Sequence, residues 1–372
     1  MIYADNAATT KLDNDAFKAM KPWLMHEYGN PSSAYSFSRK PKQALKKARE
    51  TIADCIHALP DEIYFTSGGT ESDNWAIKGV ANLGDKQNSI VTSSIEHSAV
   101  LNSCKSLERR GYHVTYLQPE QSGIITANTL EQNIIDDTFL VSVMLANNEI
   151  GTIEPIKELS SVAHAHNAIF HSDAVQAVGH IDIDVNELHI DMLSASAHKF
   201  GGPRGIGFLY VRQGIALPPY LDGGEQENGM RSGTENVANI VGMAVALKNS
   251  VDNLKSHQQH LTNLEQYLLK KLNDYNIAYT RNGGEERLPG LISLSFEGKS
   301  GEAILHRMDL MGICVSTGSA CNSKSTQISH VLQAIRLPKT LANGTIRVSL
   351  SKDNTTEDVE AIAVALCKIL SP

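Results

Sequence analysis

Apolar and amphipathic segments alternate along the chain up to about residue 250. Short apolar runs rich in β-branched residues predict strands, and the stretches between them have the periodicity of helices. The predicted strands are residues 62–66, 89–93, 113–117, 139–146, 168–174, 191–197 and 205–211. This alternation predicts an α/β fold with a mostly parallel sheet that helices cover on both faces.

The pattern changes beyond that point. Residues 253–274 have the long amphipathic repeat of a helix that packs one face on a core. Shorter apolar and helical segments follow at 291–296, 301–312 and 346–350, with a closing helix from about residue 356. A chain of 372 residues usually needs more than one hydrophobic core. We therefore expect a large domain at 12–252 and a smaller α+β domain made of 1–11 and 253–372.

Composition and charge disfavour several classes of protein. Hydrophobic residues make up 41% of the chain and charged residues 20%, which is the balance of an ordinary globular protein. The net charge of −8 disfavours a general affinity for nucleic acid or for an anionic membrane, although a local basic patch is compatible with it. No apolar run approaches the ~18 residues that a membrane span needs. The N-terminal residues also lack the basic and then apolar order of a signal peptide.

The cysteines and histidines do not indicate a disulfide framework or a metal site. The five cysteines are Cys55, Cys104, Cys314, Cys321 and Cys367, and no C-x-x-C pair occurs among them. This usage is typical of a reducing compartment, so we expect a cytoplasmic protein. His164, His166 and His171 are close in the sequence, but their segment is typical of a helix followed by a strand, and we expect no metal there.

Two glycine clusters mark turns without forming a nucleotide-binding motif. Residues 67–72 (SGGTES) lack the P-loop pattern, and residues 201–207 (GGPRGIG) lead into a strand instead of a helix. At 67–72 a predicted strand ends, two glycines turn the chain, and Thr70 begins a helix. The free N–H groups at a helix start bind phosphate well, so this turn is a candidate phosphate site. A plain turn with Thr70 as the helix cap is the alternative.

A lysine and an aspartate follow two different predicted strands. Lys199 comes after the strand at 191–197, and Asp173 lies at the end of the strand at 168–174. Ligands bind at the carboxyl ends of strands in open α/β sheets. A Schiff-base lysine, an aspartate that can pair with a pyridinium nitrogen and a phosphate-type helix start together fit pyridoxal 5′-phosphate (PLP). A surface lysine is the alternative interpretation of Lys199.

Cys321 has an unusual setting for a cysteine. It lies in the segment STGSACNSKST (316–326), whose residues are small or polar and include no large apolar side chain that could bury a thiol. Free cysteine is usually a small buried hydrophobe. The pattern therefore predicts an exposed loop, and it leaves open whether the thiol is incidental or has a chemical role.

A series of short motifs spans the chain almost from end to end. In order they are YADNAATT (3–10), YGNPSS (28–33), FTSGGTESDN (65–74), EHSAV (96–100), NNEIGT (147–152), HSDAVQAVG (171–179), SASAHKFGGPRGIGFLYVR (194–212), NGMRSGTEN (228–236), STGSAC (316–321) and IRVSL (346–350). The set resembles the cysteine desulfurases of the NifS/IscS type, within the class-V aminotransferases of PLP fold type I. This resemblance implies a seven-stranded sheet and the conversion of L-cysteine to L-alanine with transfer of the sulfur.

The resemblance also implies roles for individual residues. Lys199 would bind PLP covalently and move protons, Asp173 would hold the ring nitrogen, and His97 would stack on the ring and act in acid–base steps. The remaining cofactor contacts would be Gly69, Thr70, Ser196 and His198 at the phosphate, Asn148 and Gln176 near the phenolic oxygen, and Thr234 at the phosphate of a partner subunit. Asn30 and Arg347 would bind the substrate carboxylate, and a planar cationic fork such as Arg347 suits that task.

Cys321 gains a role from the same resemblance. Its thiolate would take the sulfur of L-cysteine as a persulfide, on a catalytic loop at about 316–327, and pass it to an acceptor. We expect a homodimer that serves an iron–sulfur scaffold protein or a tRNA-thiolating enzyme, without direct contact to nucleic acid or membrane. A selenocysteine lyase or a related PLP enzyme is one alternative, and a PLP-binding scaffold without turnover is another.

Overall fold

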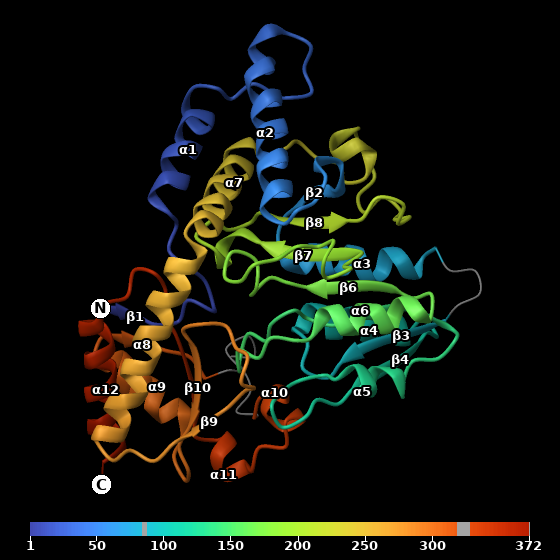
Figure 1. Ribbon diagram of the computed structural model, residues 1–372. Helices are drawn as coiled ribbons and strands as arrows, with labels where there is room; N and C mark the ends of the chain where they lie inside the picture. The colour runs from blue at the N-terminus through green and yellow to red at the C-terminus, as the bar shows by residue number, and fades with distance from the viewer. Residues whose placement is uncertain (84–87, 318–327, 372) are drawn as a thin grey trace.

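The computed structural model describes residues 1–83, 88–317 and 328–371 (Figure 1). Its largest element is a seven-stranded sheet with the strand order β2-β8-β7-β6-β5-β3-β4. The strands are β2 (Ile63–Thr66), β3 (Ser89–Ser93), β4 (His113–Leu117), β5 (Thr138–Ser142), β6 (Ile169–Asp173), β7 (Met192–Ser196) and β8 (Gly207–Val211). All neighbouring pairs are parallel except those that involve β8, which is antiparallel to β7 and β2. The expected α/β fold with a mostly parallel seven-stranded sheet is confirmed.

The antiparallel strand β8 follows from the length of its connection. A parallel pair needs a crossover of about a dozen or more residues, usually a helix. The segment between β7 and β8 holds only the short 3-10 helix η3 (Ala197–Lys199) and a glycine-rich turn. The chain therefore returns directly beside β7, and this turn brings Lys199 to the end of the sheet.

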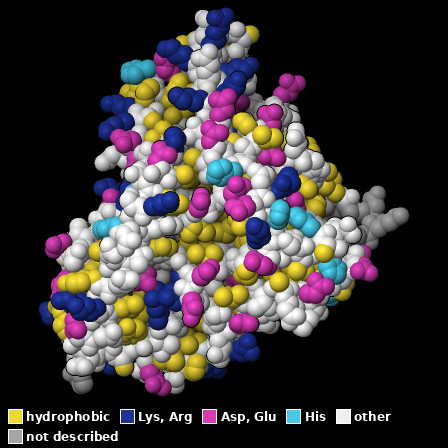
Figure 2. Space-filling view, in the orientation of Figure 1, with side chains coloured by type: hydrophobic (Ala, Val, Ile, Leu, Met, Phe, Trp, Pro, Cys, Tyr) yellow, Lys and Arg dark blue, Asp and Glu magenta, His cyan; other side chains and the backbone are white. Residues whose placement is uncertain are grey.

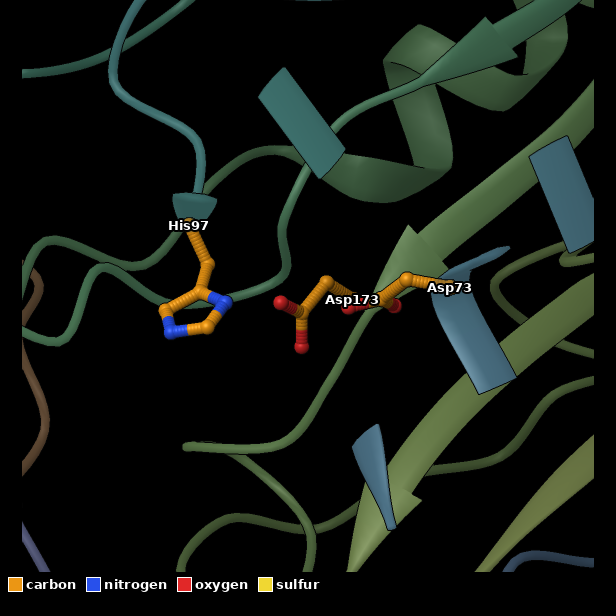
Figure 3. A group of neighbouring side chains, drawn as sticks. All are labelled: Asp73, His97 and Asp173. Carbon is orange, nitrogen blue, oxygen red and sulfur yellow. The ribbon is translucent and has the colours of Figure 1, made fainter. Parts of the chain in front are cut away.

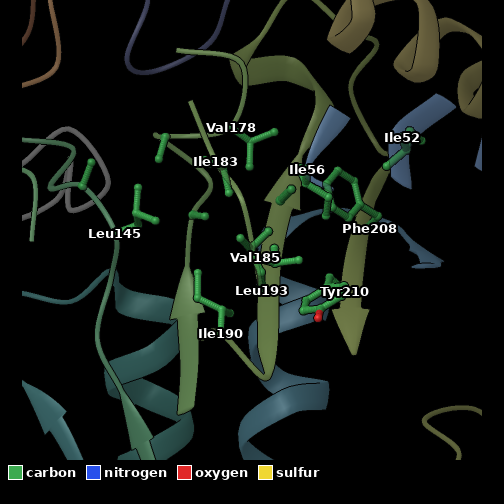
Figure 4. Close-up of a cluster of buried hydrophobic side chains, with 14 of the residues drawn as sticks. Ile52, Ile56, Leu145, Val178, Ile183, Val185, Ile190, Leu193, Phe208 and Tyr210 are labelled. Carbon is green, nitrogen blue, oxygen red and sulfur yellow. The ribbon is translucent and has the colours of Figure 1, made fainter. Parts of the chain in front are cut away.

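Helices cover both faces of this sheet, as the alternation along the sequence predicted. Leu140, Met192 and Leu209 face a cluster that includes α3 and α4. Their neighbours Val141, Leu193 and Phe208 face the opposite cluster, with α2, α6 and α7, part of which Figure 4 shows. The helices of this region are α1 (Asn14–Met25), α2 (Arg39–Cys55), α3 (Gly69–Ala81), α4 (Ser98–Glu108), α5 (Ala127–Glu131), α6 (Ile156–Ala165) and α7 (Val237–Asp252).

A second group of elements has its own sheets and its own hydrophobic cluster (orange to red in Figure 1). It contains a three-stranded antiparallel sheet of order β12-β10-β9 and the parallel pair β1-β11, so the N-terminal strand belongs to it. The strands are β1 (Ile2–Tyr3), β9 (Thr280–Arg281), β10 (Leu291–Ser295), β11 (Ile313–Cys314) and β12 (Thr345–Ser349). The helices are α8 (Leu254–Asp274), α9 (Gly301–Leu310), α10 (His330–Ala334), α11 (Lys339–Ala342) and α12 (Thr356–Leu370).

The strand predicted at 139–146 is shorter in the structure, where β5 ends at Ser142. The N–H groups of Val143 and Leu145 still donate to the carbonyls of His171 and Asp173, at 3.1 and 2.9 Å. The chain then turns back on itself through an antiparallel bridge between Ala146 and Ile153. This turn carries the asparagines of the NNEIGT motif to the end of β6.

The surface includes one basic region that the net charge did not reveal. Figure 2 shows Lys and Arg side chains over the part of the molecule where α2 lies. The exposed ones on this helix are Arg39, Lys40, Lys42, Lys46 and Lys47. Within residues 1–83, 88–317 and 328–371, no helix combines the length and apolar character needed to cross a lipid bilayer.

Candidate active site

A pocket of about 530 Å³ lies at the carboxyl ends of β6 and β7, beside the N-terminus of α3. Most of the residues predicted for the site line this pocket: Gly69, Thr70, His97, Asn148, Asp173, Gln176, Ser196, His198, Lys199 and Arg347. They come from strand ends and loops that are far apart in the sequence. The prediction that the carboxyl ends of the strands form a ligand site agrees with this convergence.

Lys199 is held by the N-terminal segment of the chain. Its Nζ donates to the carbonyl oxygens of Ala7 and Ala8, at 2.5 and 3.0 Å. Gln176 Nε2 donates to the same Ala7 oxygen at 2.8 Å. The lysine amine is therefore fixed inside the pocket, and the surface-lysine alternative is wrong for this residue.

The glycine turn before α3 allows an unusually close approach of backbone segments. Gly68 has φ of +144°, a conformation that side chains oppose, and it caps the helix without a side chain. A Cβ on Gly69 would lie 2.5 Å from Cγ2 of Val175, which is closer than atoms can pack. Thr70 is the second residue of the helix and not its cap. The turn thus exposes backbone N–H groups at a helix start, where an anion binds well.

His198 lies at the same end of the pocket. Its Nδ1 is 3.1 Å from the hydroxyl of Thr9, and burial together with the nearby Lys199 and Arg204 lowers its pKa to about 4. The ring is therefore neutral at physiological pH and can donate a hydrogen bond to an anion. The positive charge at this end of the pocket comes from Lys199 and Arg204.

Asp173, His97 and Asp73 form a compact group (Figure 3), with side-chain polar atoms within 4.8 Å of one another. Asp173 Oδ1 accepts the N–H of Val175 at 2.9 Å. Burial raises the pKa of Asp173, while the positive charges of His97 and Lys199 act in the opposite direction. A buried carboxylate at the end of a strand is a suitable partner for a cationic ring nitrogen.

His97 caps helix α4 and also faces the pocket. Its Nδ1 accepts the N–H of Ala99 at 3.2 Å, so a neutral ring carries its proton on Nε2. Figure 3 shows the imidazole opposite the carboxyl group of Asp173. The capping role of His97 is compatible with its predicted position in the site, because Nδ1 serves the helix and Nε2 is left for the pocket.

Arg347 is a buried residue of β12, with 3% of its surface exposed. Its Nη1 donates to the carbonyl oxygen of Asn148 at 2.7 Å, and Nη2 to Oδ1 of Asp5 at 2.7 Å. The Nε atom has no hydrogen-bond partner among the residues that the structure describes. The guanidinium is thus fixed at the pocket with a donor still available.

Cys321 and the rest of the segment 318–327 lie outside the described residues. The residues on either side of that segment are bound close to the pocket. Ser316 exchanges two backbone hydrogen bonds with Arg347, at 3.0 and 2.6 Å. Ser329 donates its hydroxyl to Glu149 at 2.5 Å, and this glutamate follows Asn148 in the chain. Both ends of the segment that contains Cys321 are therefore attached next to the pocket.

Two predicted residues are not among those that line the pocket. Asn30 is exposed, and its Oδ1 accepts the N–H of Ser32 at 2.9 Å. Thr234 is also exposed. The role expected for Thr234 needs a second subunit, and the roles of both residues stay predictions.

Other lining residues were not found from the sequence. Ala7, Ala8, Thr9, Asp73 and Arg204 all line the pocket, although all five lie within motifs that carry the resemblance. The run of small residues at 7–10 was a possible signal, because small side chains let the backbone approach a lysine closely. Asp73 gave no signal, since its position in a helix is typical of an exposed polar residue.

The remaining histidines and cysteines have other surroundings. His164 bonds Asp191 at 2.7 Å, His166 bonds Glu131 at 3.3 Å, and His171 bonds the hydroxyls of Ser142 and Ser194. Burial raises the pKa of Cys55 to about 11 and that of Cys104 to about 12. These two thiols are therefore poor nucleophiles near neutral pH.

Comparison with known proteins identifies the family. The model of the class-V aminotransferases matches residues 2–362, so the chain belongs to that family. A curated protein named cysteine desulfurase IscS, from Dictyoglomus turgidum, is 47% identical over 99% of this chain and 94% of its own length. Another of that name, from Methanosarcina thermophila, is 45% identical over 99% of this chain and 92% of its own length. The class-V aminotransferases and cysteine desulfurases are PLP-dependent enzymes.

Solved structures support the same family assignment. A structure described as a NifS-like protein superposes with a TM-score of 0.94 at 37% identity, and the match covers 100% of this chain and 99% of that one. A structure described as SspA in complex with cysteine has a TM-score of 0.85 at 39% identity, over 95% of this chain and 100% of that one. The resemblance inferred from the sequence is confirmed.

Proposed function

We propose that this protein is a cysteine desulfurase, which converts L-cysteine to L-alanine and takes the sulfur onto Cys321 as a persulfide. One observation carries the proposal. Lys199, Asp173 and His97 converge on one pocket, and the segment that contains Cys321 is attached at both ends beside it. The chain's similarity to curated cysteine desulfurases over nearly its whole length supports the same activity.

The residues of the pocket suit PLP as the cofactor. The pocket holds buried carboxyl groups, and both oxygens of Asp73 lack a hydrogen-bond donor among the described residues. A cationic pyridinium beside Asp173 would offset the free-energy cost of burying the negative charge of Asp173. Gly69, Thr70, Ser196 and His198 would hold the phosphate, with Thr234 of a second subunit. Lys199 would bind the aldehyde carbon, and Asn148 and Gln176 would lie near the phenolic oxygen.

The chain's own side chains position the substrate and move protons. When bound, PLP supplies an electron sink that stabilises negative charge on the substrate carbon. Arg347 would bind the substrate carboxylate through its unpaired Nε, with help from Asn30. His97 would stack on the ring and exchange a proton through Nε2, because Nδ1 is occupied by Ala99. Lys199 would move protons at the substrate carbon.

The sulfur transfer itself needs one thiolate. The sulfur of Cys321 attacks the sulfur of the substrate, and a new S–S bond forms on the enzyme. The C–S bond of the substrate breaks and leaves its electron pair on carbon, which takes up a proton to give the methyl group of alanine. No external oxidant or reductant is needed for this step, since the persulfide keeps the substrate sulfur.

Alanine release tests the proposal. The PLP-loaded protein is given L-cysteine and a reductant, beside the variants Cys321→Ser and Cys367→Ser, and alanine is measured by chromatography. We expect alanine from the native protein and from Cys367→Ser, and almost none from Cys321→Ser. Equal alanine from all three would exclude the Cys321 persulfide. The same assay with selenocysteine distinguishes a desulfurase from a selenocysteine lyase. A lyase depends less on the loop thiol, so its Cys321→Ser variant would still form alanine from selenocysteine.

The proposal extends to the surroundings of the enzyme. It includes a cytoplasmic homodimer that delivers sulfur to an iron–sulfur scaffold protein or a tRNA-thiolating enzyme. It also includes the domain division at 12–252 against 1–11 with 253–372, which the separate hydrophobic cluster of the second group of elements supports. Sedimentation of the PLP-loaded protein, with and without such an acceptor, tests the dimer and the partner together.

A further inference from the structure

Asp73 is a buried carboxyl group without an evident partner. It lies on α3, one turn after the glycines at the start of that helix, and is 1% exposed. Neither of its oxygens has a hydrogen bond of good geometry from the described residues, although the Ser194 hydroxyl lies near enough to act on its charge. A carboxylate buried in this way is costly unless donors or a cation stabilise its charge, so the group has a strong tendency to bind a proton.

Two histidines lie near Asp73, and neither of them is among the groups that lower its pKa. One is His97, whose ring lies within 4.8 Å of the Asp73 carboxyl group, and the other is His171 on β6, whose Nε2 lies 3.8 Å from Oδ1 of Asp73. Burial lowers the pKa of His171 to about 3, so that ring is neutral. Its two nitrogens also bond the hydroxyls of Ser142 and Ser194, at 2.9 and 3.0 Å.

The acidic neighbours of Asp73 also favour its protonated form. Burial raises the pKa of Asp73 well above its ordinary value, and the charges of Asp173 and Glu96 add to the effect. The Ser194 hydroxyl on β7 opposes it. Glu96, which precedes α4, has its own pKa raised to about 8 by burial, so the larger contribution at neutral pH comes from Asp173.

The surroundings of Asp173 favour its ionised form, although this residue is also buried. Burial raises the pKa of Asp173, but the N–H of Val175, which donates to its Oδ1, and the nearby His97 and Lys199 act against this rise. The polar atoms of Asp73 and Asp173 lie within 4.8 Å of one another. Ionising both carboxyl groups would be costly at this distance, so one of them keeps a proton. The donors and cations lie around Asp173, so the charge belongs there and the proton belongs on Asp73.

We propose that Asp73 and Asp173 form a carboxyl pair that shares one proton, which Asp73 holds, so that Asp173 is the ionised member facing the pocket. The role assigned to the pair rests on the proposed PLP function, because Asp173 would then meet the ring nitrogen as a full carboxylate. Asp73 is a positioning residue in this arrangement. In the proposed pair the O–H of Asp73 donates to Asp173, within the 4.8 Å that separates their polar atoms, and so stabilises the charged form of that neighbour.

Infrared spectroscopy tests the protonation of Asp73 without any turnover. The difference spectrum of native protein minus Asp73→Asn, at neutral pH, is recorded for the PLP-loaded and the cofactor-free protein. We expect the carbonyl band of a protonated carboxylic acid in both difference spectra. The matched control is Asp274→Asn at an exposed position, which should give only ionised carboxylate bands. Carboxylate bands for Asp73 as well would overturn the proposal.

Cofactor binding tests the positioning role. An asparagine amide can donate to Asp173 as the acid does, so Asp73→Asn should keep the PLP affinity and the pH midpoint of the visible absorbance of the bound cofactor. Asp73→Leu removes the donor and should weaken PLP binding about ten-fold or more, the effect of one lost hydrogen bond to a charged group. A shift of the pH midpoint by about one unit or more in Asp73→Asn would mean that Asp73 is ionised, and would overturn the proposal.

These readouts also separate this inference from the proposed function. A protonated Asp73 in the cofactor-free protein would support the pair even if no alanine were formed from L-cysteine. Active enzyme with ionised Asp73 would remove the pair and leave the desulfurase proposal intact. Thermal unfolding of each cofactor-free variant shows whether Asp73→Leu has lost its fold, and Asp73→Asn remains a test in that case.

Discussion

Arg347 and Asp5 form a partly buried ion pair, although 342 residues separate them in the sequence. Nη2 of Arg347 lies 2.7 Å from Oδ1 of Asp5, and the arginine is 3% exposed. The neighbouring backbone is joined as well, since the N–H of Asn6 donates to the carbonyl of Ser349 at 3.1 Å. The N-terminal segment therefore fixes the orientation of the arginine fork as well as the amine of Lys199. A residue that holds Arg347 in place should affect how the enzyme binds a carboxylate.

The first prediction concerns this pair. Asp5→Asn keeps the size of the side chain but removes its charge, so we expect the KM for L-cysteine to rise about ten-fold, with a smaller change in kcat. Steady-state alanine formation measures both constants. Asp15→Asn is the matched control, because Asp15 pairs with Lys18 on the exposed surface of α1 and such pairs contribute little. An unchanged KM in Asp5→Asn would contradict this role.

The second prediction concerns the contact between Gly69 and Val175. Gly69→Ala would force Cβ to within 2.5 Å of Val175 Cγ2, so the start of α3 must shift and PLP affinity should fall about ten-fold or more. The double variant Gly69→Ala with Val175→Ala removes the clashing methyl group and should recover most of the loss. Absorbance titration with PLP measures the affinity. Gly284→Ala is the control, because its new Cβ would meet neighbours only at 3.5 Å.

Much of the fold and of the site follows from local sequence patterns. Apolar runs and helical periodicity predicted the strands, and the carboxyl ends of parallel strands must meet at one edge of the sheet. Asp173 and Lys199 could therefore be placed together before the structure was known. The glycine turn at 67–72 was also recognisable as a helix start, because the strand, the glycines and the helical pattern follow one another directly.

The remaining features depend on contacts between distant segments, which a local pattern cannot reveal. Asp5 and Arg347 are 342 residues apart, and nothing near either residue indicates the other. The carbonyls of Ala7 and Ala8 hold Lys199 through backbone atoms, which carry no sequence signal of their own. Asp73 is polar in sequence but buried in the structure, because several strands of the seven-stranded sheet and helix α4 pack around α3.

The third prediction concerns the pH dependence of stability through Glu149. Burial raises its pKa to about 7, although the Ser329 hydrogen bond and the charges of Arg347 and His97 act against this. The folded state therefore binds a proton that the unfolded state has released above its ordinary pKa of ~4.3. Stability from this group is complete below that value and falls as the pH rises toward 7, by about 3 kcal/mol in total.

Glu149→Gln removes this titration and keeps an acceptor for Ser329. We expect its melting temperature to exceed that of the native protein by a margin that grows between pH 5 and pH 8, in the window that the raised pKa defines. Calorimetry of the cofactor-free proteins across this pH range measures the margin. Glu297→Gln, at an exposed position, should follow the native protein at every pH. A constant margin for Glu149→Gln would show that the buried glutamate does not titrate in this range.

The fourth prediction concerns the cysteines that the proposed reaction does not use. Thiolates react with iodoacetamide, and burial raises the pKa of Cys104 to about 12 and that of Cys55 to about 11. At pH 8 we expect both to be alkylated at least about 100-fold more slowly in the folded protein than in urea, because the thiolate fraction falls ten-fold per pKa unit. Peptide mass spectrometry over time measures each site separately. Rapid alkylation of Cys104 in the folded protein would mean that its helix opens readily, and would make it a competing nucleophile in the persulfide assay.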